Sequence, residues 1–208
     1  STFENEPANS IVGILDATDP EGGSVTYTLV SGEDAPDNAS FNILSNLLRT
    51  AISPDFETKS SYTIKLRATD PGGLSFDKVF TITVLDQNET PTDITLTPAS
   101  ISENVPGDAN VGTLSTTDPD ADDTFIYLFA IGDGDDDNGN FSISGNSLRI
   151  RNSPNYESKD SYKVRIRTTD QGGLDHERPF TITITNVNET PTGIALSASS
   201  VDENIPGN

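Results

Sequence analysis

The sequence predicts an all-β chain that folds as tandem β-sandwiches. The chain repeats itself at an interval of 100 residues, as Phe41-Asn42-Ile43 and Phe141-Ser142-Ile143 show. Each copy alternates apolar and polar residues in short segments separated by turn residues, and no helical periodicity of useful length occurs. Hydrophobic residues make up only 32% of the 208 residues, which suits two small sandwiches better than one large core.

The internal repeat sets the expected domain boundaries. Ser53-Pro54-Asp55-Phe56-Glu57 returns as Ser153-Pro154-Asn155-Tyr156-Glu157. In the first part of each copy the interval is 99 residues, because Glu4-Asn5 matches Glu103-Asn104, so one residue is inserted near 120–123. We therefore expect a first repeat over residues 1–90 with an incomplete first strand, a second repeat over 91–190, and the first strand of a third repeat over 191–208.

The segment 191–208 leaves two interpretations open. It repeats the opening segment 91–99 of the second copy, for which the first copy has no counterpart. The chain is then either a piece of a longer tandem array, or a subunit whose segment 191–208 supplies the missing strand to the next molecule. The second interpretation predicts a filament built by strand addition.

The strands within each repeat follow from the alternation of apolar side chains. Tyr62, Ile64 and Leu66 alternate with polar residues, and turn sequences such as Pro71-Gly72-Gly73 separate the segments. The expected strands cover residues 12–18, 25–30, 41–43, 47–51, 62–68 and 80–84 in the first copy, and 162–168 and 180–184 in the second. About seven strands in about 100 residues is typical of a seven-stranded Greek-key, immunoglobulin-like sandwich.

Charge and composition exclude several classes of function. Lys and Arg number 12 against 33 Asp and Glu, so a chain of net charge −21 is a poor partner for nucleic acid. The acidic residues either form a solvated surface or, in part, ligate hard cations, which prefer oxygen. With no Cys there is neither a disulfide nor a thiolate metal site, and no apolar run is long enough for membrane insertion.

A short acidic linker, Asp86-Gln87-Asn88-Glu89-Thr90-Pro91, follows the last strand of the first repeat and recurs from Asn186 to Pro191. With four further motifs it resembles the cadherin-like tandem repeats of large bacterial extracellular and surface proteins. The other motifs are an early Glu (Glu4, Glu103, Glu203), an acid or amide before aromatic-Glu (Asp55-Phe56-Glu57, Asn155-Tyr156-Glu157), Asp-Pro-acid (Asp19-Pro20-Glu21, Asp118-Pro119-Asp120) and Asp-x-Gly-Gly (Asp70, Asp170).

The resemblance implies cadherin-like sandwiches with a cluster of Ca²⁺ ions at each junction between repeats. At the first junction it assigns side-chain ligands from the first repeat and the linker, backbone carbonyls from the linker, and side-chain ligands from the second repeat. The side chains from the first repeat and the linker are Glu4, Asp55, Glu57, Asp86 and Glu89. The backbone carbonyls are those of Gln87 and Asn88, and the side chains from the second repeat are Asp118, Asp120 and Asp170. Calcium takes about 6–8 oxygen ligands, which loops and linker together can supply.

The second junction has fewer carboxylates. Asn155 and Asn186 stand where the first junction has acids, so weaker or fewer ions are expected there. The residues that remain as ligands are Glu103, Glu157 and Glu189. Each motif also has a purely structural alternative, because an Asp that precedes a turn caps it by accepting backbone N–H groups.

The leading functional hypothesis is a non-catalytic, calcium-rigidified spacer of an adhesive extracellular protein, from a bacterial surface, biofilm matrix or filament. Its expected partners are neighbouring repeats or other copies of itself, with a cell-surface protein or glycan as further candidates. The alternatives are a filament subunit that donates its C-terminal strand, and a carbohydrate-binding module of a secreted enzyme. An enzyme is not expected, because the acidic residues gather at the junctions and nothing singles out an acid–base pair.

Overall fold

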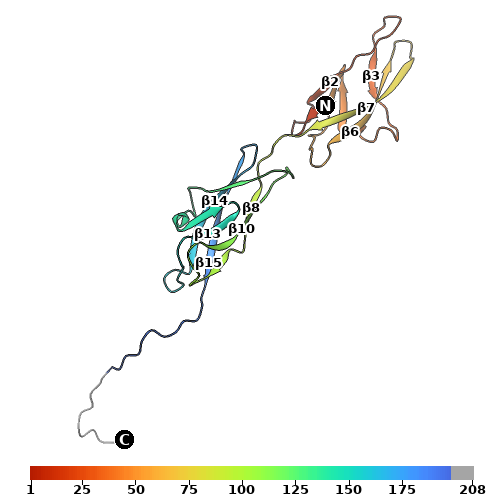
Figure 1. The fold of residues 1–208 in the computed structure, drawn as a ribbon. Coiled ribbons are helices and arrows are strands. Elements are labelled where there is room, and N and C mark those ends of the chain that lie inside the picture. Colours follow the sequence, from red (N-terminus) through yellow and green to blue (C-terminus); the bar gives the residue numbers. More distant parts are fainter. Residues whose placement is uncertain (198–208) are drawn as a thin grey trace, which may run out of the picture. The chain divides into compact units, whose positions relative to one another are not determined.

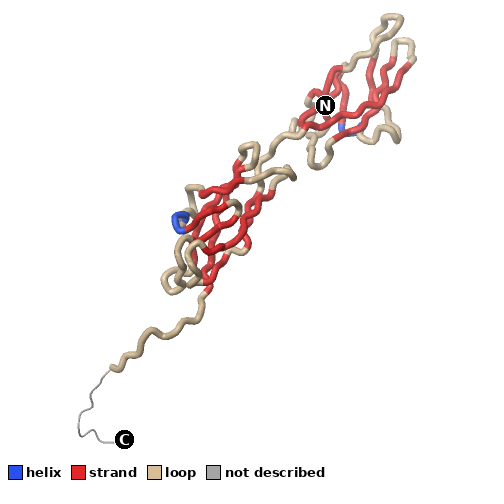
Figure 2. The backbone as a smooth tube through the Cα atoms, viewed as in Figure 1, coloured by secondary structure: helices blue, strands red, loops and turns tan. Residues whose placement is uncertain are grey.

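The computed structural model describes residues 1–197. Over these residues the chain forms two compact units: the first comprises Ser1–Thr90 with Asp118–Asp123, and the second comprises Pro91–Thr117 with the chain from Thr124 onward. The strands of each unit form a sandwich of their own (Figure 1). Strands dominate both units, and within residues 1–197 helix is confined to the short 3₁₀ turns η1 (Asn38–Ser40) and η2 (Asn138–Asn140) (Figure 2).

The first unit has seven strands in two sheets. One sheet has the order β1-β7-β6-β3 and the other β2-β5-β4. The bounds are β1 Thr2–Phe3, β2 Ile11–Ile14, β3 Thr26–Leu29, β4 Phe41–Leu44, β5 Leu47–Thr50, β6 Ser61–Thr69 and β7 Ser75–Leu85. The core between the sheets contains Phe41, Leu48, Ile64, Leu66 and Val84, which come from alternate positions of their strands.

The second unit repeats this plan with four strands in each sheet, in the orders β12-β13-β10-β8 and β11-β14-β15-β9. The bounds are β8 Asp93–Thr97, β9 Ser100–Ser102, β10 Ala109–Thr117, β11 Ile126–Phe129, β12 Phe141–Ser144, β13 Ser147–Ile150, β14 Ser161–Thr169 and β15 Asp175–Thr185. The first strand is interrupted at Pro98, so that β8 joins one sheet and β9 the other. If β8 and β9 are counted as one interrupted strand, the second unit has the seven strands of the expected sandwich.

The all-β sandwich class is confirmed, and three expected strands have other bounds for physical reasons. The expected strands 80–84 and 180–184 are the ends of the eleven-residue strands β7 and β15. These begin earlier, at Ser75 and Asp175, because an Asp and a Gly-Gly turn form a tight hairpin with the preceding strand. The expected strand 12–18 ends at Ile14, because β2 has no partner on its second edge within the described residues. The described part of the expected third repeat, 191–197, contains no strand, and Glu203 lies outside the described residues.

Candidate metal centre

Glu4 is the structural centre of the acidic cluster in the first unit. Its side chain is only 1% exposed, although it carries a carboxylate. One oxygen accepts the backbone N–H of Phe56 at 2.9 Å and the other accepts the backbone N–H of Gln87 at 2.7 Å. Because a carboxylate offers about four acceptor positions, Glu4 joins three segments of chain and retains lone pairs for a cation.

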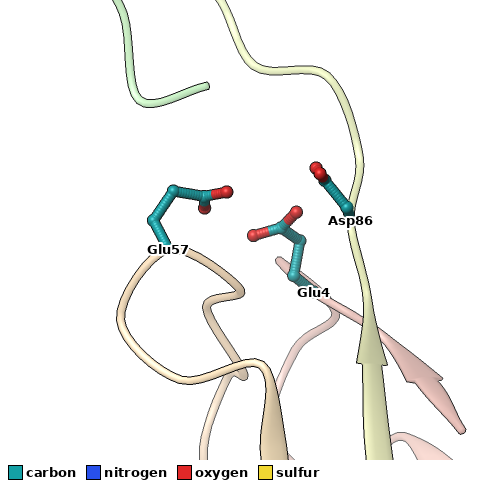
Figure 3. A group of neighbouring side chains, drawn as sticks. All are labelled: Glu4, Glu57 and Asp86. Carbon is teal, nitrogen blue, oxygen red and sulfur yellow. The ribbon is translucent and has the colours of Figure 1, made fainter. Parts of the chain in front are cut away.

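Two further carboxylates face Glu4. Glu57 comes from the loop after β5, and Asp86 comes from the chain directly after β7 (Figure 3). One oxygen from each of Glu4, Glu57 and Asp86 lies within 4.8 Å of the others. Three anionic oxygens at this spacing repel one another, and a divalent cation among them would remove that repulsion.

A second group of carboxylates shares Glu57 with the first. One oxygen from each of Glu57, Glu89 and Asp120 lies within 4.8 Å of the others, all three within the first compact unit. The backbone N–H of Glu89 donates to Asp120 Oδ2 at 2.8 Å, and the side chain of Asn5 donates to Glu89 Oε1. Glu89 Oε2 is buried and accepts no hydrogen bond from the described protein. The set of carboxylate oxygens fits Ca²⁺, and a buried carboxylate oxygen without a hydrogen-bond donor is one that a cation can bind.

The electrostatics reflect this crowding of negative charge. Burial, followed by the charges of Glu4, Asp120 and Glu57, raises the pKa of Glu89 to about 7. Burial also raises the pKa of Asp86, with the charges of Asp120 and Glu4 as the next causes. The pKa of Glu57 is raised by burial and by the neighbouring Glu4. Raised pKa values at three acids in one place indicate a site in which the ionised form lacks compensating positive charge.

The remaining ligands expected at the first junction cap turns. Asp55 Oδ1 accepts the N–H of Thr58 at 2.7 Å, and Asp118 Oδ1 accepts that of Asp120 at 3.1 Å. Asp170, in the second unit, is 4% exposed and accepts the N–H of Leu174 at 2.8 Å. Their capping role is therefore observed, while metal ligation by these three side chains and by the carbonyls of Gln87 and Asn88 stays a prediction.

The second unit builds an equivalent but less acidic cluster. Glu103 is 2% exposed and accepts the backbone N–H groups of Tyr156 and Val187 at 2.9 and 2.7 Å. These bonds, that of Val187 first, lower the pKa of Glu103. One oxygen from each of Glu103, Glu157 and Glu189 lies within 4.8 Å of the others. Asn186 takes the place of Asp86 and donates a hydrogen bond of 3.2 Å to Glu157 Oε1, so an amide occupies one side of this cluster.

The sequence-based prediction missed two asparagines that contact the clusters. Asn5 and Asn104 have the left-handed φ values of 57° and 61°, and the side chains donate to Glu89 and Glu189 respectively. Asn adopts this conformation more readily than most residues. The recurrence of Glu-Asn in Glu4-Asn5 and Glu103-Asn104 was the available signal.

Comparison with known proteins identifies the fold unit. The family model of the cadherin domain matches residues 97–185. The second repeat is similar to cadherin domains over these residues. Across both units, the cadherin pair EC1-2 of human protocadherin-24 superposes with a TM-score of 0.71 at 19% identity, covering 90% of this chain and 93% of that one. That likeness shows that the fold is the all-β cadherin-like sandwich.

Curated cadherin relatives are much longer than this chain. Protocadherin Fat 4 of Homo sapiens is 27% identical over 206 residues, and Protocadherin-20 of Homo sapiens is 29% identical over 208 residues. The matches cover 96% and 95% of this chain but only 4% and 22% of the relatives. The matched relatives are animal proteins, so the expected bacterial context gains no support from them.

The likeness to cadherins supports the coarser expectations of function. Cadherin domains are extracellular, adhesive, repeat-type modules that bind Ca²⁺ in general, and the relatives are adhesion proteins rather than enzymes. The expected extracellular or cell-surface location is thus confirmed. Among the described residues, no helix has the length and apolar character needed to cross a membrane.

Proposed function

We propose that this chain is a non-catalytic spacer of an adhesive extracellular protein, and that Ca²⁺ stiffens it at the linker 86–90. The observation that carries the proposal is the pair of carboxylate groups that share Glu57. They bring together residues far apart in the sequence, and one member, Glu89, keeps a buried oxygen without a hydrogen-bond donor. Glu4, Glu57, Asp86, Glu89 and Asp120 would hold the ions.

The mechanism is electrostatic. Without cations the clustered acids repel one another and favour a linker that moves away from the loops. With cations, Glu89 of the linker and Asp120 of the segment 118–123 are held against Glu57 in the first unit. Because the strands β10 and β11 flank that segment in the sequence, an ion that holds it restrains the chain on both sides of the linker.

Calorimetric titration of the purified chain with Ca²⁺ tests the ligand set. Glu57→Gln removes the carboxylate shared by both groups, so we expect Ca²⁺ affinity at the first junction to fall by a factor of ten or more. The matched control is Glu33→Gln, the same chemical change at an exposed loop residue, which should leave binding unchanged. Equal affinities for the two variants would contradict the proposal.

Small-angle scattering and limited proteolysis test the stiffening. A chelator should increase flexibility and expose residues 86–91 to cleavage, while each sandwich stays folded because each has its own core. A scattering profile and a cleavage pattern that do not change in chelator would show that ions do not stiffen the linker.

The wider context remains a set of predictions. A bacterial surface, matrix or filament protein, and a cell-surface protein or glycan as partner, are expectations of the sequence. Adhesion through neighbouring repeats or other copies agrees with the cadherin family; a fragment of protocadherin gammaB7, 26% identical to this chain with a TM-score of 0.60, was solved as a cis-dimer. Its alignment covers 91% of this chain and 46% of that fragment.

A further inference from the structure

Lys59 joins the turn that carries Glu57 to the body of the first unit. The turn lies between β5 and β6, and its backbone closes where the N–H of Lys59 donates to the carbonyl of Asp55 at 2.9 Å. From this point the side chain of Lys59 donates to Asp37 Oδ1 in an ion pair. Because Glu57 lies two positions before Lys59, the ion pair holds the turn close to the carboxylate that both acidic groups share.

Asp37 is itself fixed on the sheet. Its Oδ2 accepts the backbone N–H of Thr63 on β6 at 2.7 Å, and its own N–H donates to the carbonyl of Thr63 at 3.2 Å. Burial alone would raise the pKa of Asp37, but hydrogen bonds from Lys59 and Thr63 outweigh burial and hold this pKa below its ordinary value. Asp37 is therefore an ionised anchor for Lys59.

The anchor rests on the core of the unit. The ammonium group of Lys59 lies 4.9 Å from the centre of the Tyr62 ring, close enough for a cation–π contact. That ring meets Phe41 edge-on at a centroid distance of 5.6 Å, and both aromatic side chains are buried. Lys59 thus connects the turn to side chains that belong to the hydrophobic core.

Glu57 stands between two points at which its turn is held. On one side the N–H of Phe56 donates to Glu4 Oε2 at 2.9 Å, and on the other side Asp37 holds Lys59. The negative charges of Glu4 and Asp86 raise the pKa of Glu57, after burial, so they repel its ionised form. The attachment through Lys59 opposes this repulsion without adding a carboxylate to the cluster.

The second unit repeats the attachment at the same positions of its own turn. Asp137 accepts the ammonium group of Lys159 and, at 2.8 Å, the backbone N–H of Lys163. The ammonium group lies 4.7 Å from the centre of the Tyr162 ring, and the N–H of Lys159 donates to the carbonyl of Asn155 at 3.0 Å. Each cluster therefore has one Asp–Lys pair behind the turn that supplies its Glu.

The segment that carries this Asp otherwise differs between the units. Residues 33–37 read Glu-Asp-Ala-Pro-Asp and residues 133–137 read Asp-Gly-Asp-Asp-Asp, so only the last position holds the same residue. An acid needed only for a solvated surface could stand anywhere in these segments. The position that both copies keep is the one that holds the lysine.

We propose that the pairs Asp37–Lys59 and Asp137–Lys159 position Glu57 and Glu157 for cation binding without touching the cation. The inference rests on the calcium-binding function proposed above. When a pair is broken, the turn is free to move, and the ion must order it again as it binds. Ordering of a loop on binding lowers affinity, so loss of either partner should weaken Ca²⁺ binding at that cluster.

Lys59→Met separates positioning from simple electrostatics, because the two predict opposite signs. Removing a positive charge near an acidic site by itself strengthens cation binding, whereas freeing the turn weakens it. We expect Ca²⁺ affinity at the first cluster to fall by a factor on the order of ten, the effect usual for residues that orient metal ligands. Lys65→Met is the matched control, since Lys65 pairs with Asp34 at 2.9 Å in the same unit; it should leave affinity unchanged or raise it.

Hydrogen exchange at single amides reads each cluster separately. The dependence of exchange on Ca²⁺ concentration at Phe56 reports the first cluster, and that at Tyr156 reports the second. In chelator, Lys59→Met should accelerate exchange at Phe56 and Thr58 but not in β7, because only the turn is released. Exchange at Tyr156 should change in Lys159→Met instead. A general loss of stability would accelerate exchange in β7 as well.

The acidic partner gives a second test. Asp37→Asn should also weaken Ca²⁺ binding, and the double variant with Lys59→Met should bind no more weakly than Lys59→Met alone, because the two residues act as one unit. Asp34→Asn removes the same charge from the same loop and should leave the exchange at Phe56 unchanged. Circular dichroism confirms that each variant is folded.

A Lys59→Met chain that binds Ca²⁺ at the first cluster as tightly as the parent, or more tightly, would overturn the inference. Unchanged exchange at Phe56 in chelator would also overturn it. Normal binding by the parent together with either result leaves the proposed function intact, so the inference fails alone. A parent chain that binds no Ca²⁺ would overturn the proposed function and this inference with it.

Discussion

Glu4 and Glu103 show how a single residue organises a site before any ligand arrives. Each is a buried carboxylate whose oxygens accept two backbone N–H groups from segments more than 50 residues away. Hydrogen bonds to an ionised acceptor are stronger than neutral ones, so they fix the loop and the linker around the acid. The loop at Phe56 and the start of the linker at Gln87 are therefore tied to Glu4 in the metal-free protein, whereas Glu89 and Asp120 need an ion to hold them against Glu57.

The pKa of Glu89 predicts a pH dependence in the metal-free chain. Its folded pKa of about 7 lies above the ordinary value of 4.5, so folding favours the protonated acid. The stabilisation that protonation provides is complete below pH 4.5 and is lost as the pH rises through about 7. We expect the first unit, in chelator, to melt at a lower temperature at pH 8 than at pH 5.5, and Glu89→Gln to reduce this difference.

Calcium should reverse that dependence, because the ion competes with the proton for Glu89. Affinity should therefore rise from pH 6 to pH 8 with release of up to one proton, measurable by calorimetry in buffers of different ionisation enthalpy. The Glu89→Gln chain should release fewer protons. Proton release that does not change in this variant would show that another acid titrates.

Asp86 and Asn186 occupy equivalent positions in the two clusters. We therefore expect that exchanging acid and amide at these positions changes the Ca²⁺ affinity of each cluster in opposite directions. Asp86→Asn should weaken Ca²⁺ binding at the first cluster, and Asp86→Ala should weaken it more than Asn186→Ala weakens binding at the second. Conversely, Asn186→Asp should strengthen the second cluster, because it replaces an amide donor facing Glu157 with an acceptor oxygen. Calorimetric titrations that give the opposite order would overturn the ranking of the two clusters.

The members of the clusters were predictable from the sequence only where the repeat marked them. Glu4, Glu57 and Glu89 recur at fixed intervals as Glu103, Glu157 and Glu189, and the structure brings both sets together. Asn5 was missed because its contribution depends on a left-handed backbone, which a Glu-Asn pair does not specify by itself. The raised pKa of Glu89 could not be predicted, because it arises from acids that only the fold makes neighbours.

At the scale of an element, β8 shows what fastens a first strand to its sandwich. Arg178 on β15 donates to Asp93 Oδ1 at 2.6 Å and to the carbonyl of Ile94 at 2.9 Å. In the first unit the equivalent residue, Lys78, lines a cavity of about 920 Å³ instead. The Nη1 group of Arg178 holds a carboxylate and a carbonyl together, so Arg178 clamps the start of β8.

Removing the clamp should loosen β8 before it unfolds the unit. Arg178→Ala should lower the melting temperature of the second unit only slightly, because the ion pair is half-exposed and water screens it. Hydrogen exchange at the amides of Ile94 and Leu96 should accelerate more than exchange in β14. Lys163→Ala, an exposed change on β14, is the control; equal acceleration in both variants would show that Arg178 does not act on β8.

The strands β4, β5 and β6 were predictable to within one or two residues because alternation of apolar side chains decides them locally. The end of β2 was not, because residues 15–18 carry the same pattern as β10 but lack its partner. The split of the first strand at Pro98 between two sheets likewise depends on which edges are free. Strand length in a sheet thus reflects pairing as well as local sequence.

At the scale of the whole molecule, separate cores and high negative charge govern stability and cation binding. Each unit buries its own apolar residues, so a change in one acidic cluster should leave the core of the other unit intact. The chain carries a net charge of −21, which attracts divalent cations toward both clusters. Salt screens this attraction.

Calcium binding should therefore weaken as ionic strength rises. Raising NaCl from 0.1 to 1 M shortens the screening length from about 10 Å to about 3 Å, which weakens the attraction of the net charge for the ion but leaves the carboxylates of each cluster in place. Calorimetric titration at constant pH should show a lower Ca²⁺ affinity at high salt. The Glu33→Gln chain should show nearly the same dependence, because it removes one exposed acid of 33 acidic residues. Calcium affinity that does not change with salt would mean that the net charge of the chain takes no part in binding.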